Sequence, residues 1–272
     1  MPEIDESTEA SLDRIDRLLA QWRAKATTPG GLTSRPGVTP ARLLTIWGLT
    51  AHVHRQAEVL RPLLPTYSLE IAPLVRSQYE FAVTAQWLVL RGPKALPSFL
   101  NEGARQRLNL GMSTRAVGWG SDDLLERLKD ERLPRGDLDD HARHFQRMTD
   151  DFVGHETLYL LYRFASGLAH PSVTVVDDYV TRLGEGLLDV KLLRQPGSHG
   201  DATWPWIVVW SLIWAGRALD YVTNDSPSRH FYQQMARESG MAGSTLELTK
   251  EAERLAWLDS YEAQRRRPSS SQ

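Results

Sequence analysis

The sequence predicts an all-α protein of seven to ten helices, and three observations lead to that prediction. Apolar residues recur at helical spacing along most of the chain. Proline and glycine stand between these segments, at the places where helices are expected to begin or end. Strand patterns are almost absent outside residues 172–200. Such helices bury their apolar faces against one another, so a multi-helix bundle is the expected architecture.

Composition excludes several classes of protein. The chain has 272 residues, 41% of them hydrophobic and 24% charged. Its formal net charge is -2, so the charge of the whole chain does not attract it to a polyanion such as nucleic acid. It has no cysteine, which excludes disulfides and thiolate metal sites. No cofactor is expected, because neither a phosphate-binding loop nor a dinucleotide fingerprint occurs.

The longest apolar stretch predicts a buried core helix rather than a membrane span. It covers residues 204–216, and a run of thirteen is too short to cross a hydrocarbon core of roughly 30 Å as a helix. The first ten residues, MPEIDESTEA, are acidic and lack the apolar core of a secretory signal. A cytoplasmic protein without membrane contact is therefore expected.

The first predicted segment, residues 1–38, combines one helix with a flexible linker. Residues 5–23 place their apolar side chains on one stripe, and residues 24–38 are small, polar and rich in proline and glycine.

A helical domain is predicted from residue 39 to residue 265. Thr39 and Pro40 indicate where its first helix begins. The Thr39 hydroxyl can accept a hydrogen bond from a backbone N–H of the first turn that has no partner within the helix. Proline has no backbone N–H, so at the first helical position it leaves no donor unpaired. Ser121 is a similar N-cap, and Gly111 predicts a loop before it. Further helices are expected near 68–90, 94–110, 122–133, 138–148, 155–169, 203–222, 227–238 and 246–264. Residues 172–200 are the least helical, and a short hairpin or an extended loop is expected there. Residues 266–272 are predicted to be a disordered tail.

Two motifs place polar side chains on apolar helices. In LVRSQYE, Arg76 and Glu80 are four residues apart and share a helix face, where they can pair. In YRFASGLAHPS, Ser166 and His170 have the same spacing, and Pro171 predicts that the helix ends at His170. Unpaired polar groups on apolar faces are unfavourable, so we expect the two motifs to meet in one network.

These two motifs resemble a family of uncharacterised bacterial helical proteins, the domain of unknown function DUF5677. The resemblance covers about residues 40–220. The matching residues are Arg76, Ser77 and Glu80, followed by Tyr162, Ser166, His170 and Ser172.

That family in turn resembles, more distantly, the HEPN superfamily of helical nucleotide-binding and ribonuclease domains, which implies a HEPN-like core. Those domains carry an arginine and a histidine with four to six residues between them, and Arg163 and His170 match this pattern at its upper limit, with six residues between them. Phe164 follows the arginine, where those domains usually have a polar residue. The resemblance implies an RNA-cleaving or nucleotide-responding protein of the defence or toxin type. As a ribonuclease it would be a homodimer that cleaves RNA without a metal, with Arg163 and His170 as catalytic residues. Histidine moves protons near neutral pH, and arginine stabilises charge on a phosphoryl oxygen.

The residues leave a second interpretation open. His170 can be a helix-terminal residue that interacts with the helix dipole, and Arg76 and Glu80 can be a structural ion pair. The network of Arg76, Glu80, Tyr162, Ser166 and Ser172 is then structural or lines a small-ligand site. The alternative function is therefore a non-enzymatic helical dimer that binds a protein partner or a small ligand. His141 and His144 are spaced for a shared metal, but no third ligand has a suitable position and no metal is expected.

Overall fold

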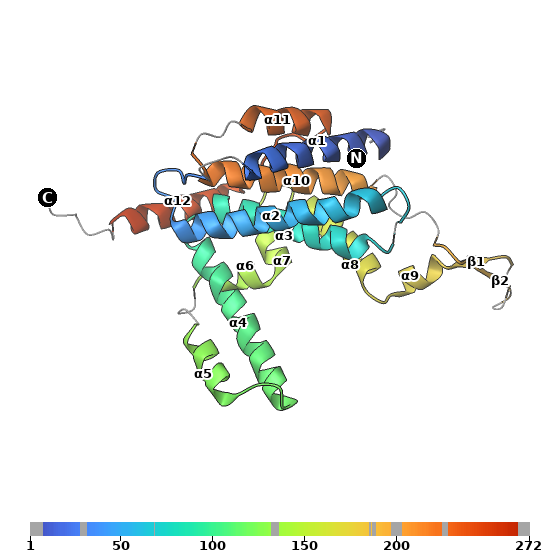
Figure 1. Cartoon of the computed structure of the whole chain (residues 1–272), viewed down its shortest axis with the longest axis horizontal. Helices are drawn as coiled ribbons and strands as arrows, with labels where there is room; N and C mark the ends of the chain where they lie inside the picture. Colours follow the sequence, from blue (N-terminus) through green and yellow to red (C-terminus); the bar gives the residue numbers. More distant parts are fainter. Residues whose placement is uncertain are drawn as a thin grey trace. The chain divides into compact units, whose positions relative to one another are not determined.

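The computed structural model describes residues 8–27, 32–67, 69–131, 136–184, 186, 189–196, 203–224 and 228–265. The described chain is almost entirely helical (Figure 1). Its longer helices are α1 (Thr8–Ala26), α2 (Pro40–Leu63), α3 (Ala72–Leu90), α4 (Ala95–Ala116), α5 (Asp122–Asp130), α8 (His155–Ala169), α10 (Thr203–Val222), α11 (Arg229–Glu238) and α12 (Lys250–Arg265). Three helices have five residues each: α6 (Asp139–Arg143), α7 (Phe145–Thr149) and α9 (Val173–Asp177). The predicted all-α class is confirmed.

The predicted hairpin is present between α9 and α10. Strands β1 (Val180–Arg182) and β2 (Val190–Leu192) pair antiparallel, with Thr181 opposite Lys191. The β-branched run before them is helical instead of extended, because Ser172 caps α9 by accepting a hydrogen bond from the Val175 N–H. The disordered tail predicted at residues 266–272 lies outside the described residues.

The chain divides into two compact units. Unit 1 comprises Met1–Gln86 and Thr157–Leu246, and unit 2 comprises Trp87–Glu156 and Glu247–Gln272. The division falls inside α3, and the predicted separation of residues 1–38 from the rest does not coincide with it. In unit 1 the N-terminal helix α1 packs against α10 and α2, because its stripe of Ile15, Leu18 and Trp22 is buried.

The Trp-rich helix α10 is the centre of unit 1. It packs against α1, α2 and α11 (Figure 1). Almost all of its side chains are buried. An apolar surface on all sides is what a helix surrounded by neighbours requires. Among the described residues no helix is both long enough and apolar enough to span a membrane.

Buried glutamines fix α3 against its neighbours in unit 1. Gln78 donates its Nε2–H to the carbonyl of Val53 on α2 over 3.0 Å, and Gln86 donates to the carbonyl of Trp214 on α10 over 2.7 Å. Tyr79 donates its hydroxyl to the carbonyl of Leu158 on α8. These bonds satisfy buried polar groups and set the rotation of α3 about its axis, which decides where Arg76 points.

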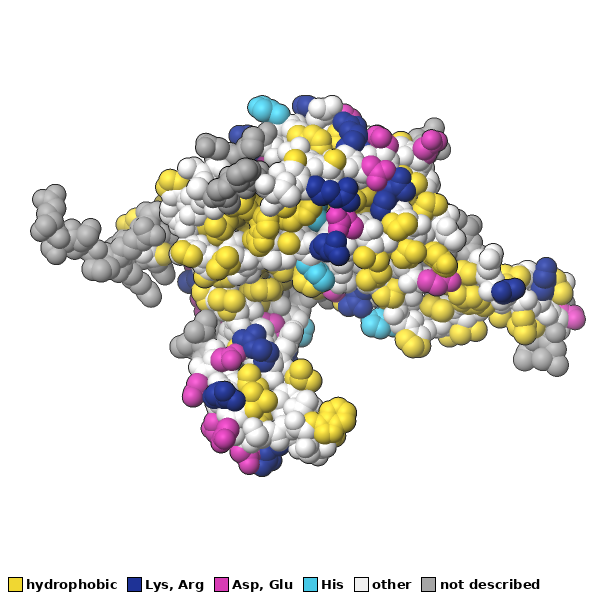
Figure 2. All heavy atoms as spheres, in the orientation of Figure 1, with side chains coloured by type: hydrophobic (Ala, Val, Ile, Leu, Met, Phe, Trp, Pro, Cys, Tyr) yellow, Lys and Arg dark blue, Asp and Glu magenta, His cyan; other side chains and the backbone are white. Residues whose placement is uncertain are grey.

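The outer surface of unit 1 mixes both signs of charge. Figure 2 shows Lys and Arg side chains intermixed with Asp and Glu side chains on this surface. Among them, Arg17 pairs with Glu238, and Arg61 pairs with Asp16. Exposed pairs of this kind contribute about 0–1 kcal/mol each, so they are a minor source of stability.

In unit 2, α4 continues past the predicted loop at Gly111. The helix runs to Ala116 because Gly111 lies against Leu125 and Leu128 of α5; an added Cβ would approach the Leu128 side chain to 2.8 Å. Glycine here allows two helices to pack closely rather than ending one of them. As predicted, Ser121 caps α5 through the Leu124 N–H.

Candidate active site

The end of α8 is built by three consecutive residues. Pro171 disfavours helical geometry in the residue before it, and α8 accordingly ends at Ala169 with His170 just beyond it. Ser172 then donates its hydroxyl to the carbonyl of Gly167 over 2.7 Å while it caps α9. Ser172 therefore holds the turn between α8 and α9, and its side chain hydrogen-bonds only to backbone groups of the described chain.

Arg76 on α3 makes the contact that joins the two sequence motifs. Its Nη1 lies 2.7 Å from Nε2 of His170, which is exposed to solvent. A guanidinium only donates hydrogen bonds, so Nε2 of His170 is the acceptor. The imidazole in this arrangement is neutral and carries its proton on Nδ1.

Two further groups orient the Arg76 guanidinium. Its Nη2 donates to Oε1 of Glu80 over 3.1 Å and to the hydroxyl of Tyr162 over 3.0 Å. The guanidinium carbon also lies 4.9 Å from the centre of the Tyr162 ring, within range of a cation–π interaction. We call these four residues, Arg76, Glu80, Tyr162 and His170, the Arg76 cluster. Its ion pair is partly screened by water, since 21% of the Arg76 side chain and 32% of the Glu80 side chain are exposed.

Ser166 lies on α8 between Tyr162 and His170, one helical turn from each. Its hydroxyl oxygen is buried and has no hydrogen-bond partner among the described residues, and the same holds for Nε of Arg76. Two polar atoms without partners are uncommon in so small a region, because a buried donor or acceptor costs about 1–3 kcal/mol when unsatisfied. A water or ligand oxygen would satisfy either atom.

Arg163 does not take part in the Arg76 cluster. Its side chain is exposed, and no hydrogen bond or ion pair connects it to another described residue. The next residue, Phe164, turns toward α10 and packs on Trp204, with ring centres 5.3 Å apart. The sequence predicts that Arg163 lies close to His170. In the structure the arginine in contact with His170 is Arg76, which comes from α3.

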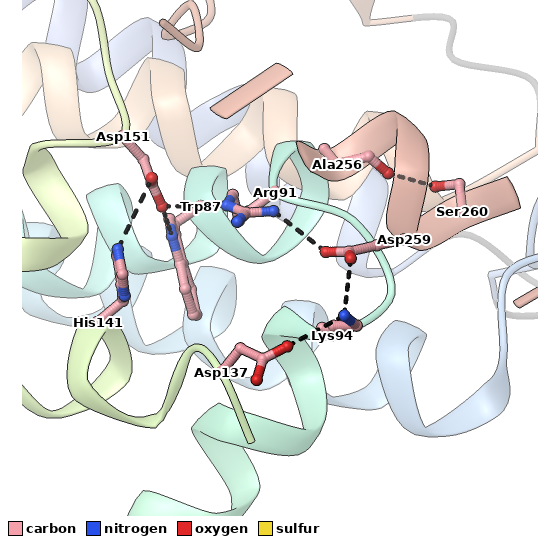
Figure 3. A network of polar contacts seen from close by, with 9 residues as sticks. All are labelled: Trp87, Arg91, Lys94, Asp137, His141, Asp151, Ala256, Asp259 and Ser260. Atoms are coloured by element: carbon pink, nitrogen blue, oxygen red, sulfur yellow. Dashed lines mark hydrogen bonds and ion pairs between the residues drawn. The ribbon is translucent and has the colours of Figure 1, made fainter. Parts of the chain in front are cut away.

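A second polar network lies in unit 2, and the sequence analysis did not predict it (Figure 3). Asp151 accepts a hydrogen bond from Nε1 of Trp87 over 2.8 Å and lies 3.3 Å from Nε of Arg91. Asp259 on α12 pairs with Arg91 over 3.3 Å and with Lys94 over 2.9 Å. No local motif marks these residues, because they come from three separate segments. The only signal in the sequence is an Arg and a Lys that follow an apolar helix.

The histidines considered as metal ligands do not belong to the Arg76 cluster, and His141 lies at the edge of the Asp151 network. Nε2 of His141 is 3.9 Å from Oδ1 of Asp151 (Figure 3). His144 directly follows α6 as its C-cap. No group of three or more metal-ligating side chains occurs within the described part of the chain.

No protein-family model, curated protein or solved structure matches the chain. Its function is therefore inferred from the geometry of the Arg76 cluster and the exposed residues around it.

Proposed function

We propose that this protein cleaves RNA without a metal ion, in the manner of HEPN-like ribonucleases, with His170 as the proton-transferring group. The observation that supports this most is an exposed imidazole whose Nε2 lies 2.7 Å from a guanidinium nitrogen of Arg76. A group that moves protons near neutral pH and a permanent cation therefore stand together at the surface.

His170 differs from the histidine that this chain uses for packing. His54 on α2 is completely buried, hydrogen-bonded to the Thr50 carbonyl and stacked on Trp22. The His170 ring is open to solvent, and its hydrogen bond is to the charged side chain of Arg76. Solvent access is a requirement for a group that exchanges protons with a large substrate.

The chemistry requires one proton to leave and one to return. His170 accepts the proton of a ribose 2′-OH, the 2′ oxygen bonds to phosphorus, and the bond from phosphorus to the 5′ oxygen breaks. A protonated imidazole returns a proton to that leaving oxygen, so the products carry a 2′,3′-cyclic phosphate and a 5′-hydroxyl. Arg76 is bonded to Nε2 in the free chain. A bound phosphate would replace His170 as its acceptor and free Nε2 to act as a base.

Glu80 and Tyr162 are positioning residues in this proposal. Both bind Nη2 of Arg76 and leave its Nη1 directed at His170. Arg163 supplies a second positive charge on the exposed side of α8, where no carboxylate of the described chain neutralises it.

A second copy of the chain would complete the site. The outward side of α8 carries Leu160, Arg163 and Gly167 at helical spacing, and 61% of Leu160 is exposed. Phe164 borders this side, because it packs on Trp204 and still leaves 37% of its surface exposed. Pairing of two such faces about a two-fold axis would bury these apolar groups and bring two copies of Arg163 together.

The test is cleavage of a 5′-labelled single-stranded RNA in the presence of EDTA. We expect the wild-type chain to cleave it and to leave 2′,3′-cyclic phosphate ends. His170→Ala should reduce the rate by about 10²–10⁴, as expected for loss of a general acid–base group. Arg163→Ala should reduce cleavage without changing the melting temperature. The matched control is His230→Ala, which removes an exposed histidine from α11 and should retain full activity.

The closed geometry of the Arg76 cluster favours one alternative. Both terminal nitrogens of Arg76 already have partners, which is the arrangement expected if the network only connects α3 to the end of α8. The protein would then be a non-enzymatic helical dimer that binds a protein partner or a small ligand. In that case wild-type protein leaves RNA intact, and His170→Ala lowers the free energy of unfolding by about 0.5–1.5 kcal/mol.

A further inference from the structure

In unit 2 the short helix α6 packs against α4, and an open space lies beside Gly136, just before α6. Among the described residues beyond its chain neighbours, a Cβ added to Gly136 would meet two atoms within 4 Å, and both are oxygens. Oγ of Ser98 on α4 would lie at 3.2 Å and Oδ1 of Asp139 on α6 at 3.3 Å. Gly136 is itself exposed, so solvent reaches this space, which we call the Gly136 gap. Two oxygens from different helices therefore converge on one accessible position.

The carboxylate of Asp139 has no positive partner at this position. Its Oδ2 accepts a hydrogen bond from Nδ2 of Asn101 over 2.6 Å. Its Oδ1 is buried and has no hydrogen-bond partner, and no ion pair connects the carboxylate to a cation of the described chain. A buried carboxylate is unfavourable unless a counter-charge lies beside it.

The described cations of α4 and α6 belong to other carboxylates. Lys94 binds Asp137 over 3.1 Å and Asp259 over 2.9 Å (Figure 3). Arg105 donates to both carboxylate oxygens of Glu102, and the arginine at the end of α6 acts electrostatically on the same glutamate. The negative charge at the Gly136 gap is therefore the one that these cations leave without compensation.

Asn101 supplies a second buried oxygen without a partner. The residue is only 6% exposed, and its Oδ1 has no hydrogen-bond donor among the described residues. Because its Nδ2 is bonded to Asp139, this Oδ1 belongs to an amide that lies directly against the carboxylate. Water could donate a hydrogen bond to each of these oxygens, but water does not neutralise the charge. A cation does both.

We propose that the Gly136 gap binds a calcium ion, with Oδ1 of Asp139 as the charged ligand and Oγ of Ser98 and Oδ1 of Asn101 as neutral ligands. Ca²⁺ prefers oxygen ligands, tolerates irregular geometry and completes its coordination with water, which reaches the gap. The set contains no nitrogen or sulfur ligand, which argues against zinc. One of the three ligands is a carboxylate and none is a histidine, so this set differs from the histidine and carboxylate groups considered above.

The bound ion would connect the start of α6 to α4 within unit 2. A single charged ligand predicts weak binding, with a dissociation constant of about 10⁻⁴–10⁻³ M. The Arg76 cluster belongs to unit 1, so this role is separate from the metal-independent cleavage proposed there.

Calorimetric titration with CaCl₂ and the melting temperature of the full chain test this proposal. EDTA-treated wild type should bind Ca²⁺ and melt about 3–6 °C higher when Ca²⁺ is present at about ten times its dissociation constant. Asp139→Asn keeps the shape of the side chain and removes its charge, so it should weaken Ca²⁺ binding about 10-fold or more. Gly136→Ala retains all three ligands and places a methyl group in the gap, so it should also abolish the Ca²⁺-dependent rise in melting temperature.

The matched control is Asp130→Asn, which removes an exposed carboxylate from α5 of the same unit and should leave the Ca²⁺ response unchanged. MgCl₂ should have a smaller effect than CaCl₂, because Mg²⁺ requires nearly ideal octahedral geometry. The proposal is overturned if wild type shows neither binding nor a higher melting temperature in about 5 mM CaCl₂, several times the expected dissociation constant. It is equally overturned if Asp139→Asn and Gly136→Ala respond like Asp130→Asn, or if Mg²⁺ and Ca²⁺ act alike, as expected for non-specific binding to surface carboxylates. The RNA cleavage assay contains EDTA, so the two proposals can fail separately.

Discussion

His54 and His170 have the same side chain and opposite surroundings, and those surroundings decide what each can do. His54 lies on α2 and is buried against Trp22 of α1. Its Nδ1 is hydrogen-bonded to the Thr50 carbonyl, which can only accept, so Nδ1 carries the proton. Its Nε2 is buried without a hydrogen-bond partner in the described structure. Burial disfavours the charged ring and lowers the pKa of His54 to about 4, although the Thr50 hydrogen bond and Glu58 oppose this shift.

This lowered pKa predicts a pH dependence of stability. As pH falls, the unfolded chain binds a proton at the ordinary histidine pKa of about 6.5, whereas the folded chain resists protonation until pH about 4. The contribution of His54 to the free energy of unfolding is therefore present above pH 6.5 and is lost between the two values. Between pH 7 and pH 5 we expect a loss of about 2 kcal/mol.

Urea unfolding of wild type and His54→Gln at both pH values measures this effect. The variant has no titrating group at position 54, so its stability should change less over the same interval, even if it is lower throughout. Equal pH dependence in the two proteins would show that His54 is protonated in the folded chain as easily as in the unfolded one.

At the scale of elements, two helices of unit 1 approach closely because one residue lacks a side chain. Gly216 lies inside α10, and an added Cβ there would overlap the ring of Tyr232 on α11. Tyr232 is almost completely buried and burial raises the pKa of its hydroxyl, so the ring has little room to move. The contact between α10 and α11 therefore depends on glycine at this position.

Gly216→Ala should lower the free energy of unfolding by about 1–3 kcal/mol, the usual cost of an oversized side chain in a packed core. Gly48→Ala is the matched control, because Gly48 lies inside α2 with nothing within 4 Å of an added Cβ. Alanine forms helix better than glycine by about 0.5–1 kcal/mol, so this variant should be more stable than wild type. Thermal unfolding followed at 222 nm distinguishes the two outcomes, and a stabilised Gly216→Ala protein would contradict the close approach.

At the scale of the whole molecule, the exposed side of α8 predicts an association of two chains. Leu160 and Phe164 are apolar and exposed on this side, next to Arg163, and the proposed catalysis requires a second copy there. Leu160→Glu should therefore convert a dimer into a monomer, because burial of two opposed carboxylates is strongly unfavourable. Light scattering coupled to size-exclusion chromatography measures the mass directly.

Leu44→Glu is the control for this experiment. Leu44 lies on α2 of the same unit and is 67% exposed, close to the 61% of Leu160, so the two substitutions introduce the same charge at comparable sites. We expect Leu44→Glu to leave the mass unchanged. A monomeric wild type, or a dimer that survives Leu160→Glu, would exclude α8 as the interface.

The amino-acid sequence by itself determined the helical class, the caps at Thr39 and Ser121, and the end of α8 before Pro171. It also determined the pairing of Arg76 with Glu80. These features depend on neighbours within about one helical turn, where spacing and residue type fix the geometry.

Only the tertiary structure decided which polar residues meet. Arg76 and His170 are 94 positions apart, and the buried glutamines of α3 give Arg76 the place beside His170 that local spacing had assigned to Arg163. Gly111 continues a helix because α5 packs on it, and the Asp151 and Asp259 networks join segments that no motif connects. Contacts of this range depend on how apolar faces pack, and one-dimensional spacing does not encode the rotation of one helix against another.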